Sequence, residues 1–128
     1  MMKDLIINGS RQLDIPLDDV QVDKLMEYAR LLVEWNEKIN LTAITDDEGI
    51  VTKHFLDSLT AIKTGYVMGK VIDVGTGAGF PGLVLKIAKP EIKLTLLDSL
   101  NKRINFLKDV CETVSYTHLR AHETPEHL

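Results

Sequence analysis

Over residues 5–64, apolar side chains recur at three- and four-residue steps, the spacing that places them on one face of a helix. The longest stripe predicts an amphipathic helix from residue 18 or 19 to about residue 39, with Asp18 and Asp19 favouring its N-terminus. The stripe consists of Leu25, Ala29, Leu32, Trp35 and Ile39. A short helix is expected over residues 5–13, interrupted at Gly9-Ser10. A third is expected over about residues 47–64, with Ile50, Val51, Phe55, Leu59 and Ile62 facing inward.

The pattern changes after Gly65 and Gly69, which mark a turn. Residues 71–74 and 93–98 are short, nearly continuous apolar runs, typical of buried strands of a parallel sheet. A helix over residues 83–88 is expected to join them, and another over about residues 101–113 to follow. A strand, a helix and a second strand predict a right-handed βαβ unit, and therefore an α/β fold with a parallel sheet.

A glycine-rich segment, VIDVGTGAGFPG at residues 71–82, stands where the first strand meets the first of these helices. Glycine has no Cβ, so such a turn lets backbone N–H groups approach a small ligand closely. Gly75 and Gly77 fit the dinucleotide fingerprint, but Phe80 stands in place of its third glycine. The D-x-G-x-G-x-G spacing that begins at Asp73 resembles instead the first motif of S-adenosylmethionine-dependent methyltransferases. A purely structural turn is the alternative.

The second strand ends in an acid, Asp98. It follows the loop by roughly 20 residues, the distance expected of a carboxylate that binds a ribose. Asp98 is then expected to accept hydrogen bonds from both ribose hydroxyls of an adenosine. The alternative is that Asp98, or Ser99 beside it, caps the following helix.

Composition narrows the class of protein. The chain has 128 residues, 45% of them hydrophobic and 27% charged, with a formal net charge of −4, which indicates one modest globular domain. The acidic balance excludes a broad nucleic-acid-binding surface, so any RNA contact is expected to be local. Cys111 is the single cysteine and is expected to be a buried, inert thiol. No apolar run approaches the ~20 residues that span a membrane.

Residues 114–128 depart from this order and show neither helical nor strand periodicity. They contain three of the four histidines, but His118 and His122 lack a third metal ligand, and no metal is expected. The segment resembles translated sequencing-adapter or cloning read-through, so it is interpreted as a non-native tail.

Further motifs indicate a family. In order, the chain carries WNEKINLT at 35–42, KHFLDS at 53–58, the glycine segment, and LDS at 97–99 followed by Lys102 and Arg103. Over approximately residues 1–113 this set resembles the bacterial methyltransferases that modify a guanine N7 of 16S ribosomal RNA, the glucose-inhibited division protein B family. The resemblance implies a helical N-terminal cap, residues 1–65, on the parallel sheet of a class I methyltransferase (Rossmann-like) domain. Residues 66–113 are expected to be the N-terminal part of that domain. Members are considerably longer, so a C-terminally truncated, incomplete domain is expected.

The resemblance also implies a cofactor, partners and a site. The implied cofactor is S-adenosyl-L-methionine, and the implied partner is 16S ribosomal RNA or a small ribosomal subunit precursor. The protein is expected to be cytoplasmic and not to associate with a membrane. The expected cofactor-binding residues are Asp73, Gly75, Gly77, Gly79, Phe80, Asp98 and Ser99. The expected substrate-side residues are Asn40, Lys53, His54, Asp57, Lys102 and Arg103.

Several of these residues have ordinary structural alternatives. Asn40, just past the long helix, is expected to cap it in preference to reaching a loop of the cofactor site. Trp35 falls on the apolar stripe, which favours core packing over base stacking. His54 and Asp57 are spaced to contact each other across a helix surface, and Lys53 fits an ordinary solvated charge.

No catalytic residue is predicted, because guanine N7 has a free lone pair and no proton. In-line attack on a sulfonium methyl then needs alignment at roughly 3–3.5 Å and no general base. Asp73 is close enough in sequence to the loop to stabilise positive charge there, or to bond the loop's own backbone. Two other functions stay open: an NAD-dependent oxidoreductase, and a non-catalytic fragment or RNA-interaction module. Exposed strand edges of a short sheet are expected to favour self-association.

Overall fold

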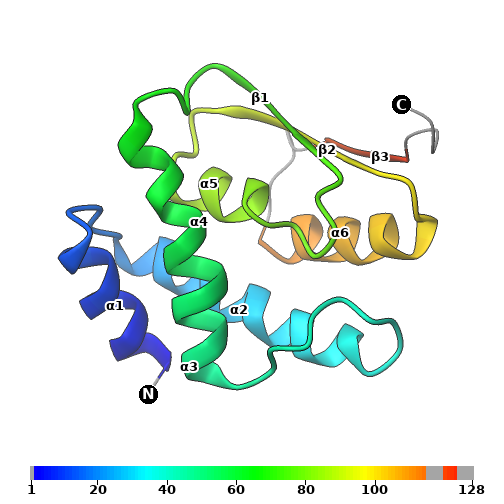
Figure 1. The fold of residues 1–128 in the computed structure, drawn as a ribbon, viewed down its shortest axis with the longest axis horizontal. Coiled ribbons are helices and arrows are strands. Elements are labelled where there is room, and N and C mark those ends of the chain that lie inside the picture. The colour runs from blue at the N-terminus through cyan, green and yellow to red at the C-terminus, as the bar shows by residue number, and fades with distance from the viewer. Residues whose placement is uncertain (1, 115–119, 124–128) are drawn as a thin grey trace.

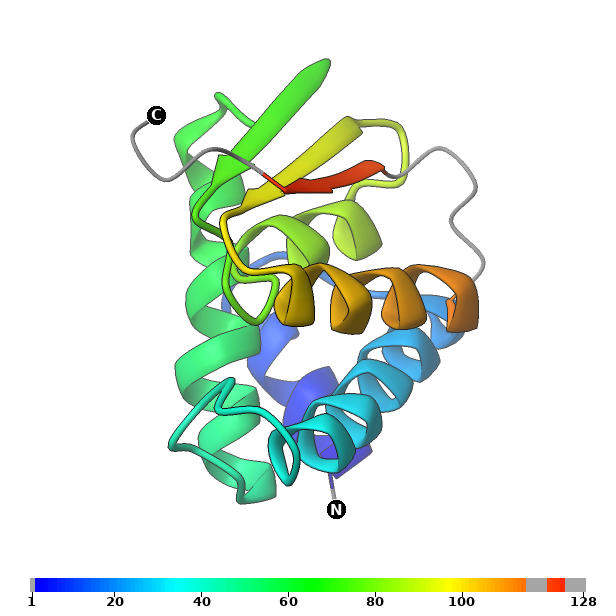
Figure 2. The same cartoon turned by 90° about the vertical axis from the view of Figure 1, so that its right-hand side faces the viewer.

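The computed structural model describes residues 2–114 and 120–123. Three parallel strands lie on one side of two helices, and a group of N-terminal helices packs beyond them (Figure 1). Figure 2 shows the two helices beneath one face of the sheet. The predicted α/β class, with a parallel sheet and a helical N-terminal cap, is confirmed.

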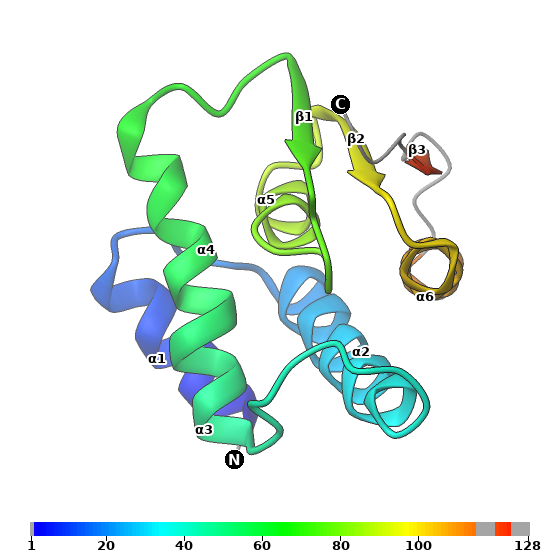
Figure 3. The ribbon, with the colours of Figure 1, turned by 45° about the vertical axis from the view of Figure 1, so that its right-hand side comes forward.

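The cap begins with helices α1 (Met2–Gln12) and α2 (Asp19–Asn36). A continuous helical column follows (Figure 3), made of α3 (Asp47–Gly49), η1 (Ile50–Leu56), α4 (Asp57–Leu59) and η2 (Thr60–Thr64). A capping box starts α2: the Asp18 side chain accepts from the Gln21 N–H, and the Gln21 side chain accepts from the Asp18 N–H, both at 2.8 Å. The column ends at Gly65, whose φ of 78° lies in the left-handed region.

Three details of the cap differ from the sequence prediction. Helix α1 runs through Gly9-Ser10 without interruption. Gly9 lets α1 pack closely on η1, since a Cβ there would lie 3.0 Å from Leu56 Cδ2. Ser10 is buried and donates to the Ile7 carbonyl at 3.1 Å, which satisfies its hydroxyl within the helix. Helix α2 ends at Asn36, three residues early, and η1 is a π-helix, which no sequence pattern indicated.

The sheet consists of β1 (Lys70–Val74), β2 (Lys93–Asp98) and β3 (Arg120–Glu123). Its order is β1-β2-β3, with Ile72 opposite Thr95 and Leu96 opposite Ala121. Helix α5 (Gly82–Ala88) joins β1 to β2, and α6 (Asn101–Thr113) follows β2. Both helices and the first two strands lie where the sequence predicts them.

Two predictions about the sheet are wrong. Residues 120–123 form β3, although no strand was expected there, because the backbone of β2 offers its second edge for parallel pairing. Strand β1 is not buried: Ile72 and Val74 are 62% and 69% exposed, since α5 and α6 cover only one face of the sheet. The interpretation of residues 114–128 as a non-native tail stays a prediction.

The core lies where the cap helices meet α5, α6 and the covered face of the sheet. Its largest fully buried side chains come from both parts of the chain, and include Tyr28, Phe55, Phe106, Leu83 and Leu94. Trp35 packs against this core and donates from Nε1 to Asp109 at 2.8 Å, which confirms the packing role expected for it. The cap and the sheet therefore share one core. Within the described residues, no helix combines the length and apolar character needed to cross a membrane.

Candidate functional site

The loop after β1 uses its glycines in two ways. Gly75, Gly77 and Gly79 have φ values of 69°, 60° and 96°, a region that L-residues rarely adopt. A Cβ on Gly75 or Gly77 would meet nothing within 4 Å, so the backbone there is open to a ligand. A Cβ on Gly79 would collide with the Tyr28 hydroxyl and would lie 2.6 Å from Leu83 Cδ1. Gly79 is therefore required for packing.

The loop is fastened to the end of β2. The N–H groups of Gly75 and Thr76 donate to the Leu97 carbonyl at 2.8 and 3.1 Å, and Gly79 N–H donates to the Thr76 carbonyl at 3.0 Å. The Thr76 side-chain oxygen is buried without a hydrogen bond of normal geometry to any described residue, although the hydroxyl is near enough to Asp73 to lower that carboxyl's pKa. A buried hydroxyl such as that of Thr76, without a hydrogen bond of normal geometry in an open glycine loop, fits a site for a polar ligand.

Asp98, at the tip of β2, points into this loop. Its Oδ2 accepts from Gly77 N–H at 2.8 Å and its Oδ1 accepts from Leu100 N–H at 2.9 Å. Arg103 Nη1 lies 3.5 Å from Oδ1, and the Asp98 side chain is only 2% exposed. The two strand tips therefore meet, as a shared ligand site requires. The carboxylate binds the protein's own N–H groups, and Ser99 beside it is exposed.

Asp73 supports the loop from the other side. Its Oδ2 accepts from Gly82 N–H at 3.0 Å, and a Cβ on Gly82 would lie 2.8 Å from that oxygen. Burial raises the pKa of Asp73, and the nearby Thr76 hydroxyl and the hydrogen bond from Gly82 N–H partly offset that rise. Of the two roles considered for Asp73, the structure shows the bond to the loop's own backbone.

Phe80 lies against aromatic rings of the cap. The His54 ring stacks on it with centroids 4.4 Å apart and planes 9° apart, and the Tyr28 ring stacks at 5.3 Å and 21°. His54 Nε2 and Thr42 Oγ1 are hydrogen-bonded at 2.8 Å. Burial lowers the pKa of His54, and the charge of Asp57 opposes this. The imidazole is therefore expected to be neutral at pH 7.

A small cavity of about 290 Å³ opens beside Phe80. It is lined by Lys53, His54, Asp57, Ser58, Ala61, Phe80 and Pro81. The structure thus brings three of the substrate-side candidates next to the glycine loop. Asn40 and Lys102 are exposed and do not line this cavity, and Arg103 is held at Asp98.

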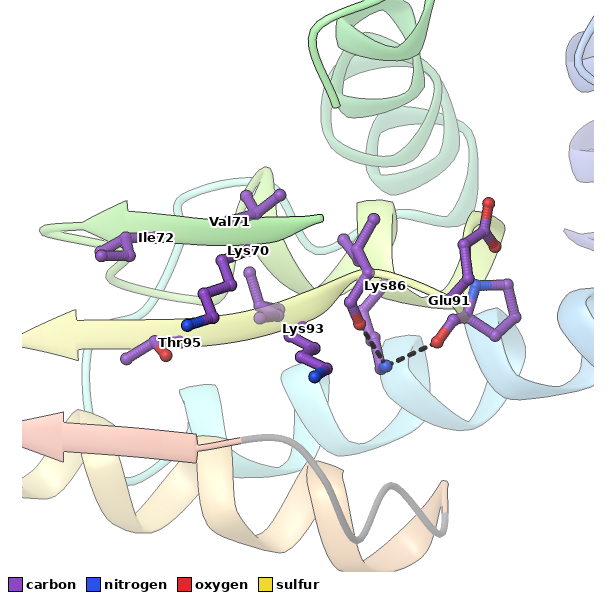
Figure 4. Close-up of a pocket in the computed structure, with 10 residues that line it drawn as sticks. Lys70, Val71, Ile72, Lys86, Glu91, Lys93 and Thr95 are labelled. Carbon is purple, nitrogen blue, oxygen red and sulfur yellow. Dashed lines mark hydrogen bonds between the residues drawn. The ribbon is translucent and has the colours of Figure 1, made fainter. Parts of the chain in front are cut away.

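A larger hollow of about 710 Å³ lies at the opposite, amino ends of β1 and β2 (Figure 4). The Lys86 ammonium group donates there to the carbonyls of Pro90 and Ile92, each at 2.6 Å. Ligands of open α/β sheets bind at the carboxyl ends of the strands. The glycine loop, and not this hollow, is therefore the candidate site.

Sequence reasoning missed four residues that build this site: Tyr28, Asn36, Thr42 and Thr76. Tyr28 lies on the buried side of α2, where a phenol needs a hydrogen-bond partner, and this was the available signal. Asn36 Oδ1, not Asn40, binds the chain after α2, accepting from Leu41 and Thr42 N–H at 2.8 and 3.0 Å. Helical periodicity carried no sign of these tertiary roles.

The first strand of the parallel sheet ends in an open glycine loop, and an acid from the second strand is directed into that loop. This arrangement defines an α/β fold of the class I methyltransferase (Rossmann-like) type. The fold is incomplete here and carries a helical cap. A sequence model of the family described as rRNA small subunit methyltransferase G matches residues 21–125, and the chain belongs to this family.

Curated relatives support this assignment. The chain is 52% identical over 128 residues to "Ribosomal RNA small subunit methyltransferase G" of Alkaliphilus metalliredigens, a match that covers 94% of this chain and 54% of the relative. Proteins of the same name from Caldanaerobacter subterraneus and Streptococcus pneumoniae are 49% and 50% identical, covering 88% and 84% of this chain and 48% and 47% of theirs. The chain thus spans about half the length of the curated relatives it matches.

Proposed function

We propose that this chain carries the cofactor-binding part of a methyltransferase that uses S-adenosyl-L-methionine to methylate N7 of a guanine in 16S ribosomal RNA, in the cytoplasm. The observation that carries the proposal is the meeting of the open glycine loop with Asp98, at 2.8 Å from Gly77 N to Asp98 Oδ2. Family membership and the names of the relatives supply the class of reaction.

The residues present fit this cofactor. Open space beside Gly75 and Gly77 gives its methionine part access to the backbone, and the Thr76 hydroxyl has hydrogen-bonding capacity left. Asp98 would exchange its hydrogen bond from Gly77 N–H for hydrogen bonds from the ribose hydroxyls. Hydrogen bonds to an ionised carboxylate are stronger than those to a neutral acceptor. When bound, adenosylmethionine supplies a methyl group on a positively charged sulfur. The carboxylates of Asp73 and Asp98, both hydrogen-bonded to the glycine segment, would favour that positive charge.

The cavity beside Phe80 is the proposed approach for the target base. Lys53 offers a donor for a phosphate or carbonyl oxygen, Asp57 offers an acceptor, and the stacked ring pair of His54 and Phe80 gives a flat wall. Guanine N7 carries a lone pair and no proton, so these residues need only orient the base. The neutral His54 is consistent with a positioning role and is not needed as a base.

The proposal is tested by calorimetric titration of the chain with adenosylmethionine and, separately, with NAD. Binding of adenosylmethionine alone is expected, because Phe80 stands where a dinucleotide-binding loop has its third glycine. Binding of NAD without adenosylmethionine would overturn the proposal in favour of an oxidoreductase.

The second function considered, a non-catalytic fragment or RNA-interaction module, is not favoured by the family match, although Ile72 and Val74 of β1 are exposed. Transfer of tritium from methyl-labelled adenosylmethionine to hypomethylated 16S ribosomal RNA separates it from an enzyme. Labelled RNA would eliminate the non-catalytic function. Cofactor binding without labelled RNA would support it.

A further inference from the structure

Tyr28 reaches the glycine loop from the cap. It lies on α2, is fully buried, and its hydroxyl donates a hydrogen bond to the carbonyl of Ala78, 50 residues further along the chain. Burial raises the pKa of the Tyr28 phenol well above its usual value, and the negative charge of Asp73 raises it further. The hydroxyl therefore keeps its proton and acts as a donor throughout the neutral range.

The same side chain makes two further contacts with the loop. Its ring stacks on Phe80 with centroids 5.3 Å apart, and its hydroxyl fills the space where a Cβ of residue 79 would lie. The loop carries glycine at position 79, with φ 96°, at the point where Tyr28 enters. Tyr28 thus contacts consecutive residues 78, 79 and 80.

Helix α2 also holds the far end of α5. Gln21 Nε2 donates to the carbonyls of Ile87 and Ala88, each at 3.1 Å, at the C-terminus of α5. Gln21 and Tyr28 are seven residues apart, which is about 10 Å along a helix and close to the length of α5 itself. One cap helix therefore binds both the loop that precedes α5 and the carbonyls that end it.

We infer that Tyr28 is a positioning residue for the cofactor loop: its bond to Ala78 and its stack on Phe80 set the loop conformation in which Gly75 and Gly77 face open space. The inference rests on the proposed function, because only the ligand gives the loop conformation a purpose. It assigns the cap a role in cofactor binding, in addition to whatever RNA contacts the cap makes.

The test compares Tyr28→Phe with Tyr66→Phe. Both changes remove one phenolic hydroxyl, but Tyr66 is 87% exposed, which makes it a matched control. Tyr28→Phe is expected to weaken adenosylmethionine binding about tenfold, the scale of one buried hydrogen bond whose acceptor is left unpaired. Tyr66→Phe is expected to bind like the wild type.

A second readout separates positioning from general stability. In ligand-free Tyr28→Phe, the backbone amides of Gly77 and Gly79 are expected to exchange with solvent deuterium about tenfold faster, whereas those of β2 keep their wild-type rates. A purely structural role would accelerate exchange in both places. Unchanged loop exchange together with unchanged affinity would overturn the inference.

Two outcomes are kept distinguishable. If the wild type fails to bind adenosylmethionine, the proposed function fails, and the ligand-free exchange experiment still decides whether Tyr28 positions the loop. If Tyr28→Phe does not fold, the hydroxyl proton of Tyr28 is observed directly by NMR in the wild type. A slowly exchanging, downfield resonance is expected for the bond to Ala78, and rapid exchange of that proton with solvent would contradict the inference.

Discussion

At the scale of single residues, two glycines share a left-handed backbone conformation and open surroundings, but only one of them lies in the glycine loop. Gly77 has φ 60° with open space beside it, and Gly65, at the end of the helical column, has φ 78° and equally open space. Any L-residue at either position adopts a left-handed conformation that costs about 1–2 kcal/mol. Only Gly77 belongs to the candidate site.

Gly77→Ala and Gly65→Ala therefore make a matched pair. We expect urea denaturation to show a similar loss of about 1–2 kcal/mol for both, because both replace a glycine with positive φ. Only Gly77→Ala is expected to lose adenosylmethionine binding by calorimetry, since its methyl group enters the ligand side of the loop. Equal affinities for the two variants would show that the open side of Gly77 is not the cofactor site.

Cys111 gives a pH-dependent prediction at the same scale. Burial raises the pKa of its thiol from 9.0 to about 12. The folded chain holds this proton more tightly than the unfolded chain, so the stability it contributes is present below pH 9 and is lost as the pH rises toward 12.

At pH 8 the native thiol is expected to react with Ellman's reagent about a thousandfold more slowly than the thiol of the unfolded chain, because its thiolate fraction is smaller by that factor. The chain unfolded in guanidinium chloride is the control. The sequence predicts a buried thiol, and the structure leaves Cys111 half-buried against the core. Comparable rates in the two states would mean that this packing does not protect the thiol.

At the scale of elements, the segment after α2 links the helical cap to the site. Asn36 accepts from the N–H groups of Leu41 and Thr42, and Thr42 in turn binds His54, whose ring lies on Phe80. A single amide at the end of one helix therefore supports the ring that borders the small cavity.

Asn36→Ala is expected to cost about 1–2 kcal/mol, since it leaves two backbone donors of the segment without their acceptor. Asn40→Ala removes an exposed amide and is expected to stay within about 0.5 kcal/mol. Thermal unfolding measures both. A larger loss for Asn40→Ala would restore the capping role that the sequence suggested for it, and a selective loss of cofactor affinity in that variant would support its predicted place in the site.

At the scale of the whole molecule, the sheet has one covered and one uncovered face. Helices α5 and α6 lie on the covered face (Figure 2). Ile72 and Val74 of β1 are 62% and 69% exposed on the other face. Tyr66 and Met68, just before β1, are also largely exposed. Apolar surface and an unpaired strand edge together favour association between chains.

Concentration-dependent dimerisation is therefore expected in size-exclusion chromatography. The double variant Ile72→Thr, Val74→Thr is expected to shift the chain toward monomer, because it makes the uncovered face polar and keeps the β-branched shape. Val20→Thr is the control, since Val20 is 61% exposed but lies on α2, away from the sheet. A compact monomer at all concentrations would contradict this prediction.

The sequence by itself determined the elements and the motif. Helical periodicity, the apolar runs and the glycines placed α6, β2 and the loop at the residues where they lie, because spacing and glycine act locally. The family, too, followed from motifs that can be read along the chain.

Only the tertiary structure decided how those pieces are used. Contacts between residues distant in sequence decide whether Asp98 meets the loop, which residue supports Phe80 and which face of β1 remains exposed. They also decide that Gly9 is where α1 packs closely on η1. A buried phenol such as Tyr28 needs a partner, but nothing local to α2 identifies that partner as a carbonyl 50 residues away. Packing makes that choice, because the backbone group that fills the position beside the phenol is set by the whole fold.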